Sequence, residues 1–312
     1  MDVSHTHGKI LVIRGGAIGD FILTLPALAA LRQQFPNARL EVLGYPHIAQ
    51  LVLAGGLADD VKSIEARALA TFFACDGQLD ESLATYFAGF ALIISYLYDP
   101  DEVFRSNMAR CSAAQFIVGP HRPDEKLALH ATEVFLKPLE KLAIYDADPV
   151  PLLPINHQPS TLNRLALHPG SGSERKNWPE ENWMRLIQYL HNATQFSFLL
   201  VGGEAEVGRL RRLSAVFPPD RLELAQCLPL AELARRLQSC LGFIGHDSGI
   251  SHLAAALGVP ALVLWGETSE TIWRPRGERV TVLRSPEGLQ GLAVERVLDQ
   301  LRHFLPAGED AQ

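Results

Sequence analysis

Three loops of this chain combine glycine with charged or polar side chains that can bind a ligand or accept a proton. The first, Arg14–Asp20 (RGGAIGD), stands between an apolar run and a helical pattern. Its glycines let the backbone approach a ligand closely, and Asp20 offers a carboxylate that either caps the helix or accepts a proton. Neither a G-x-G-x-x-G spacing nor a following Lys-Ser/Thr pair is present, so the loop does not predict a dinucleotide site or a P-loop NTPase.

The second loop, Ser171–Lys176 (SGSERK), precedes a helix whose start is marked by Pro179. Small residues expose backbone N–H groups, and Lys176 adds a positive charge, which together suit a phosphate group. The alternative is a lysine that is simply solvated.

The third loop, Gly245–His252 (GHDSGISH), places Ser248 and His252 four residues apart, on one face of a first helical turn. The free backbone N–H groups of that turn favour an anion. A serine hydrolase is excluded because the loop lacks the G-x-S-x-G elbow, and the alternative for His252 is a core histidine. The three loops together favour a ligand that contains phosphate.

Apolar runs of strand length alternate with helical patterns along the chain, which predicts an α/β protein with parallel sheets covered on both faces. Ligands of such sheets bind beyond the carboxyl ends of the strands, where these loops stand. We expect strands over residues 10–13, 40–43, 91–94, 165–167, 196–201, 243–244 and 261–264, and helices over about 20–31, 179–191, 204–216, 230–238, 249–257 and 292–304.

The length of 312 residues suits two domains, and four prolines between Pro149 and Pro159 predict the linker. We therefore expect an N-terminal Rossmann-like domain over 1–155 and a C-terminal one over 156–312. The last amphipathic helix either packs locally or crosses back to the first domain.

The composition, with 47% apolar and 20% charged residues, is that of a globular protein. A net charge of −7 without dense Lys/Arg runs argues against nucleic acid as a partner. The first half is the more acidic one, so a basic patch there would need Arg14, Arg105, Arg110 and Arg122 to converge in space.

Four cysteines without a C-x-x-C pair predict neither a zinc site nor a disulfide framework. His5 and His7 are only a weak metal signal, so we expect no metal site. The polar segment 1–9 is unlike a signal peptide, and the apolar runs are too short to span a membrane. We expect a cytoplasmic protein, with peripheral contact at the inner membrane left open and the oligomeric state undetermined.

Five segments make the sequence resemble glycosyltransferase family 9, the ADP-heptose:lipopolysaccharide heptosyltransferase-like enzymes. They are Ile10–Pro26, Leu167–Pro179, Leu200–Gly203, Gly245–Pro260 and Leu264–Thr268. The resemblance implies a GT-B fold, in which two Rossmann-like lobes with parallel sheets face a central cleft. It further implies an inverting glycosyltransferase with no cofactor, which moves a heptose or similar sugar from an ADP-type nucleotide-sugar to a bacterial glycan or lipid-linked glycan acceptor.

The resemblance also implies a role for individual residues. Asp20 matches the general base, and Lys176 matches a lysine that binds the diphosphate and offsets its growing charge. The remaining donor-side matches are Ser171, Gly172, Asp247, Ser248, Gly249 and His252 for phosphate, with Glu206 (less so Glu204) and Leu228 for ribose and base. The acceptor-side matches are Gly19, Arg14, Arg122 and His130.

The chain departs from the family pattern at Gly15-Gly16, where polar residues are common, and at Glu267, where proline is common. Other functions stay open: a nucleotide-sugar-binding protein without transferase activity, or a GT-B-type nucleotide-sugar epimerase. A nicotinamide oxidoreductase is disfavoured by the glycine spacing. The transferred sugar, the nucleobase and the acceptor are not specified by the sequence.

Overall fold

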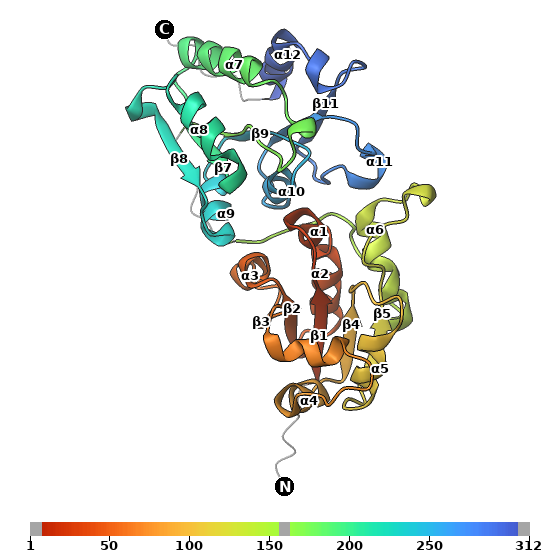
Figure 1. The fold of residues 1–312 in the computed structure, drawn as a ribbon. Helices are drawn as coiled ribbons and strands as arrows, with labels where there is room; N and C mark the ends of the chain where they lie inside the picture. The colour runs from red at the N-terminus through yellow and green to blue at the C-terminus, as the bar shows by residue number, and fades with distance from the viewer. Residues whose placement is uncertain (1–7, 156–162, 305–312) are drawn as a thin grey trace. The chain divides into compact units, whose positions relative to one another are not determined.

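A computed structural model describes residues 8–155 and 163–304 of the chain. The chain divides into two compact units, Met1–Leu153 and Pro154–Gln312, next to the boundary that the prolines predict at residue 155. Each unit is a parallel sheet with helices on both of its faces (Figure 1). The prediction of two parallel α/β domains is thus confirmed.

The first unit contains a five-stranded sheet in the order β3-β2-β1-β4-β5. The apolar run at 10–13 becomes the central strand, where both faces are covered and continuous apolar residues are stable. The strands are β1 (Lys9–Arg14), β2 (Arg39–Gly44), β3 (Asp60–Ser63), β4 (Leu92–Ser95) and β5 (Gln115–Val118). The helices are α1 (Ile18–Ile22), α2 (Leu25–Gln34), α3 (Pro46–Ala54), α4 (Glu81–Ala88), α5 (Val103–Ala109) and α6 (Ala131–Leu136), with 3-10 turns η1 (Arg67–Phe73), η2 (Glu125–Leu127) and η3 (Lys137–Leu142).

The prediction of a single helix over residues 20–31 was wrong, because the structure has two helices, which Leu23 and Thr24 separate. Pro26 has no N–H to donate to the carbonyl of Ile22, which ends the first helix. The hydroxyl of Thr24 donates to the Asp20 carbonyl at 2.8 Å. The break leaves α1 as a short helix whose first turn holds Asp20.

The core of the first unit on one sheet face is rich in aromatic rings. Leu11, Ile13 and Leu43 of the sheet pack with Phe72 of η1 and Phe87 of α4. The rings of Phe72 and Phe87 meet edge to face, with 4.9 Å between their centroids. This packing fixes the strands whose carboxyl ends carry the first glycine loop.

The second unit contains a six-stranded sheet in the order β11-β10-β9-β6-β7-β8. Its strands are β6 (Arg164–His168), β7 (Ser197–Gly202), β8 (Leu222–Gln226), β9 (Gly242–His246), β10 (Ala261–Trp265) and β11 (Val280–Arg284). Its helices are α7 (Glu180–Ala193), α8 (Val207–Ser214), α9 (Leu230–Gln238), α10 (Gly249–Ala256), α11 (Glu270–Trp273) and α12 (Val294–Phe304), with 3-10 turns η4 (Glu174–Lys176), η5 (Glu204–Glu206), η6 (Pro219–Arg221) and η7 (Leu289–Gly291).

One large core joins this sheet to α7, α8 and α12. Trp183 and Ile187 of α7 pack with Leu165 of β6, and Val297 and Leu301 of α12 belong to the same cluster. The helices α7 and α12 lie side by side (Figure 1). The described residues of the last helix are therefore part of the second unit.

Within the described residues, no helix is both long and apolar enough to cross a membrane. Across residues 8–155 and 163–304, no three His, Cys, Asp or Glu side chains gather as metal ligands would. His5 and His7 lie outside the described residues. The four cysteines are free thiols, and burial raises the pKa of Cys240 to about 12.

Candidate active site

The loop that follows β6, residues 169–178, is held by residues at the carboxyl end of β9. The two strands are neighbours, with His168 opposite Gly245, so their following loops leave the sheet side by side. Lys176 Nζ lies 2.7 Å from Asp247 Oδ2, and Ser248 Oγ lies 3.3 Å from His168 Nδ1. The structure thus brings together the second and third glycine loops, which the sequence places far apart.

Lys176 and Asp247 form an ion pair of unequal exposure. The Lys176 side chain is 40% exposed, whereas that of Asp247 is 9% exposed. Asp247 Oδ2 also accepts a hydrogen bond from the hydroxyl of Thr268, a residue for which the sequence predicts no role. An ammonium group carries three N–H donors, so Lys176 keeps donors for a ligand while Asp247 fixes its position.

Ser248 caps α10, and its hydroxyl accepts from the backbone N–H of Ser251. Gly249 is the first residue of this helix, and His252 is buried in its first turn. The N-terminal end of a helix attracts anions through its free N–H groups and its dipole. Ser248 therefore shapes this helix end.

Glu206 joins the loop after β6 to the loop after β7. Its Oε1 accepts from Gly172 N at 3.3 Å, and its Oε2 accepts from Gly203 N at 2.9 Å. A Cβ at Gly170 would lie 2.1 Å from Glu206 Cγ, so any side chain there would have to displace Glu206. The carboxylate is buried in this position, while Glu204 in the same turn is exposed.

The other donor-side residues lie on neighbouring loops. Ser171 Oγ lies 2.7 Å from Asn177 Oδ1, so its hydroxyl supports the loop itself. Gly172 has a φ of 74°, a conformation that favours glycine. Leu228 is half-buried just after β8, and the N–H of the preceding Cys227 donates to the Gly202 carbonyl at 2.9 Å. Each of these residues thus stands at the carboxyl edge of the second sheet.

His246 and His168 are buried histidines at the site that were not predicted as site residues from the sequence. Burial lowers the pKa of His168 to about 4 and that of His246 to about 3, so both rings are neutral at pH 7. The His246 Nε2 accepts from the backbone N–H of Trp178 at 2.9 Å, and its Nδ1 donates to the Gly170 carbonyl at 3.2 Å. The sequence feature that could have indicated His246 is its place at the end of an apolar strand, next to Asp247.

Asp20 lies in the first turn of α1, at the carboxyl end of β1. Its Oδ2 accepts from Ala17 N at 3.2 Å, and its side chain remains 31% exposed. Gly16 has a φ of 100°, and a Cβ there would lie 3.1 Å from Asp20 Oδ2. The carboxylate therefore caps the helix and still reaches solvent, so the two roles considered for it are compatible.

Arg14 is buried beneath Asp20 and holds its backbone. Its guanidinium donates to the Asp20 carbonyl at 3.1 Å and to the His121 carbonyl at 2.9 Å, and lies 4.4 Å from the centre of the Phe135 ring. Burial lowers the pKa of Arg14 from its usual value. The Arg14 side chain is only 2% exposed, so it contacts the Asp20 backbone from the protein interior.

The other acceptor-side residues do not share one environment. Gly19 lies in α1, Arg122 is exposed and pairs with Glu125 at 3.3 Å, and the buried ring of His130 caps α6 by accepting from Thr132 N at 3.2 Å. Their contact with an acceptor stays a prediction.

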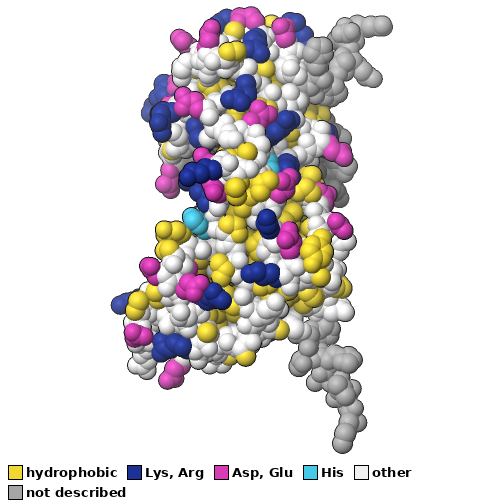
Figure 2. All heavy atoms as spheres, turned by 90° about the vertical axis from the view of Figure 1, so that its right-hand side faces the viewer, with side chains coloured by type: hydrophobic (Ala, Val, Ile, Leu, Met, Phe, Trp, Pro, Cys, Tyr) yellow, Lys and Arg dark blue, Asp and Glu magenta, His cyan; other side chains and the backbone are white. Residues whose placement is uncertain are grey.

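Each of the four arginines named for a basic patch already contacts another group, and their convergence in one patch stays a prediction. Arg14 is buried, and Arg105 and Arg122 each pair with a nearby glutamate, while Arg110 donates to Asn107. Acidic and basic side chains are interspersed among the described residues on the face that Figure 2 shows.

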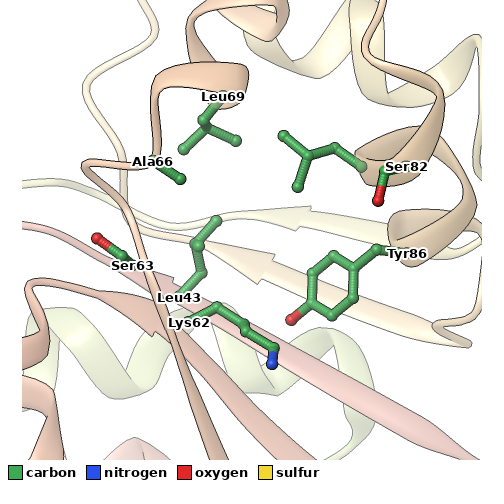
Figure 3. Close-up of a pocket in the computed structure, with 8 residues that line it drawn as sticks. Leu43, Lys62, Ser63, Ala66, Leu69, Ser82 and Tyr86 are labelled. Atoms are coloured by element: carbon green, nitrogen blue, oxygen red, sulfur yellow. The ribbon is translucent and has the colours of Figure 1, made fainter.

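A separate pocket of about 240 Å³ lies in the first unit, between β2, β3, η1 and α4. Figure 3 shows Lys62 and Tyr86 on one side of it and Ala66 and Leu69 on the other. Two of its polar groups are already engaged: Lys62 Nζ lies 3.3 Å from Asp60, and the Tyr86 hydroxyl donates to Glu41 at 3.0 Å. This pocket contains none of the predicted site residues.

The two parallel-sheet α/β units, with glycine loops and polar side chains at the carboxyl edges of their sheets, define the GT-B fold. Residues 149–297 match the sequence model of glycosyltransferase family 9 (heptosyltransferase). The resemblance to that family is thereby confirmed, with the match lying almost entirely in the second unit.

Three known proteins show how far the similarity extends. Lipopolysaccharide heptosyltransferase 1 of Salmonella typhimurium is 34% identical over 112 residues, which cover 36% of this chain and 35% of that protein. The aligned segment thus spans about a third of the length of that relative. Lipopolysaccharide heptosyltransferase 3 of Escherichia coli is 22% identical over 84% of this chain and 83% of its own. The structure of E. coli heptosyltransferase WaaC with ADP has a TM-score of 0.74 at 20% identity, over 95% of this chain and 99% of that one.

Proposed function

We propose that this protein is an inverting glycosyltransferase that transfers a heptose or a similar sugar from an ADP-linked donor to a bacterial glycan acceptor of the lipopolysaccharide-core type. The observation that carries the proposal is the Lys176–Asp247 pair, which joins two glycine loops inside the segment that matches family 9. The names of the relatives support heptose as the sugar, and the solved complex of a structural neighbour supports ADP as the carrier.

In the proposed reaction, the second unit binds the donor. The diphosphate is negative, and the exposed Lys176 ammonium together with the N-terminal end of α10 offers it positive charge. As the bond between the anomeric carbon and the phosphate oxygen breaks, its electron pair passes to the leaving ADP. Lys176 stabilises that charge in the transition state. No cofactor is required for this chemistry.

The first unit supplies the base. The acceptor hydroxyl oxygen forms the new bond to the anomeric carbon, and its proton passes to the Asp20 carboxylate. The 31% exposure of Asp20 leaves it accessible, and its bond to Ala17 N fixes its direction. Attack on the face opposite the leaving group inverts the configuration at the anomeric carbon.

The test is an incubation of the purified protein with ADP-heptose and a heptose-free lipopolysaccharide acceptor, analysed by mass spectrometry. Transfer gives an acceptor heavier by one sugar residue and free ADP. A nucleotide-sugar-binding protein would leave both compounds unchanged, and an epimerase would isomerise the sugar without any acceptor.

A further inference from the structure

His246 contacts both ends of the loop that carries Lys176 and Ser171. Its Nδ1 donates to the Gly170 carbonyl at 3.2 Å, and its Nε2 accepts from the Trp178 N–H at 2.9 Å. The ring is fully buried at the end of β9 and meets the Trp183 ring edge to face at 5.5 Å. One side chain thus connects the first and last turns of the loop to the central part of the sheet.

The two hydrogen bonds define one protonation state of the ring. A carbonyl can only accept and a backbone N–H can only donate, so Nδ1 carries the proton and Nε2 does not. A second proton on Nε2 would face the Trp178 N–H. Burial acts in the same direction, because it disfavours the charged ring. The two hydrogen bonds from His246 to the loop therefore require the neutral form of the ring.

The loop between these ends contains Gly172 and carries polar groups of the donor side, Ser171 and Lys176. Gly172 adopts a φ of 74°, and the short turn Glu174–Lys176 places the ammonium beside Asp247. Without the ring, a buried carbonyl and a buried N–H would lose their partners, and such groups rearrange rather than remain unpaired. The rearrangement would displace the loop and with it the ammonium.

We propose that His246 is a positioning residue, which sets the conformation of residues 170–178 and thereby the position of Lys176 for a nucleoside diphosphate. The role rests on the proposed function for its ligand, although the two hydrogen bonds to the loop exist without one. His246 acts through the loop backbone, in contrast to Lys176, which acts on the ligand by its charge.

The experiment compares the full-length wild type with three variants of this position. His246→Phe keeps a planar ring and removes both hydrogen bonds. His246→Gln can still accept from Trp178 N–H, and His246→Asn can still donate to the Gly170 carbonyl. The control is Ile244→Val on the same strand, whose side chain lies in the core. The two readouts are amide hydrogen exchange of residues 170–178 and the calorimetric affinity for ADP.

For His246→Phe we expect faster exchange across the loop and an affinity for ADP about tenfold weaker. We expect the Trp178 amide to exchange faster in His246→Asn than in His246→Gln. This comparison tests the role of His246 even if the Phe variant does not fold. Ile244→Val should leave both readouts at wild-type values.

Two results have distinct meanings. Wild-type exchange in the loop of His246→Phe, or wild-type affinity for ADP, would overturn the role of His246. An absence of ADP binding by the wild type itself would instead overturn the proposed function, while the exchange data would still show whether His246 orders the loop.

Discussion

The ammonium of Lys176 lies 2.7 Å from the carboxylate of Asp247, a residue 71 positions further along the chain. The pair connects the loop after β6 with the loop after β9, and Thr268 donates to the same carboxylate. Asp247 is nearly buried and Lys176 is half-exposed, so the carboxylate holds the lysine in place while the lysine remains accessible to a ligand.

The charge of Lys176 should matter for binding of the diphosphate. We expect Lys176→Met to weaken ADP affinity by about tenfold or more, because a charge-assisted hydrogen bond contributes roughly 1.5–3 kcal/mol. Calorimetry measures this directly. The matched control is Arg175→Met, an exposed cation in the same turn, for which the affinity should stay within about twofold.

The ion pair should couple the two residues in stability. Because the pair is half-exposed, we expect a coupling free energy of only about 0.5–1 kcal/mol in a double-mutant cycle of Lys176→Met and Asp247→Asn. Urea unfolding of the two single variants and the double variant gives the value. Strictly additive effects would show that the contact contributes nothing to folding.

Gly16 should be required both for the conformation of its backbone and for the position of the Asp20 carboxylate. Its φ of 100° and its closeness to the Asp20 carboxylate both resist a side chain. We expect Gly16→Ala to lower the free energy of unfolding by about 1–3 kcal/mol and to reduce transfer activity. Gly56→Ala is the control, since Gly56 has a φ of 65° with open space around it. Its variant should lose stability but keep its activity, and equal activity losses in both would contradict a role for the Asp20 contact.

The two buried histidines should make the protein less stable in mild acid. Their pKa values in the folded state, about 4 for His168 and about 3 for His246, lie below the usual value of 6.5. Between those values the unfolded chain binds more protons than the folded one, so stability falls as the pH drops below about 6.5.

From pH 6.5 to pH 5 we expect a loss of roughly 3 kcal/mol in the free energy of unfolding, with each ring contributing about half. Urea unfolding at both pH values measures it. In His246→Gln the loss should shrink by about half, and an unchanged loss would show that His246 does not remain neutral in the folded protein.

Much of the fold could be predicted from the sequence, because the central strands are continuous apolar runs. The segments at 10–13 and 165–167 were correctly predicted as strands. All four edge strands, β3, β5, β8 and β11, escaped prediction, since an edge strand is partly exposed and needs no continuous apolar run.

The loops of the candidate site could be located from the sequence, but their contacts could not. Glycines and charged residues mark loops locally, whereas the bond from His246 to Trp178 joins residues 68 positions apart and depends on which strands are neighbours. Likewise, the hydrogen bond from Gly172 N to Glu206 could not be predicted from the sequence. Glu206 can take this position because Gly170 has no side chain.

The proposed role of Asp20 as the base is tested by sugar transfer in the Asp20→Asn variant. Asparagine can still accept the Ala17 N–H bond, so the variant should fold and bind ADP like the wild type. With ADP-heptose and a heptose-free lipopolysaccharide acceptor, mass spectrometry should show product formation by the wild type and a rate at least about 100-fold lower in the variant. Equal rates of product formation in the two proteins would contradict the role of Asp20 as the base.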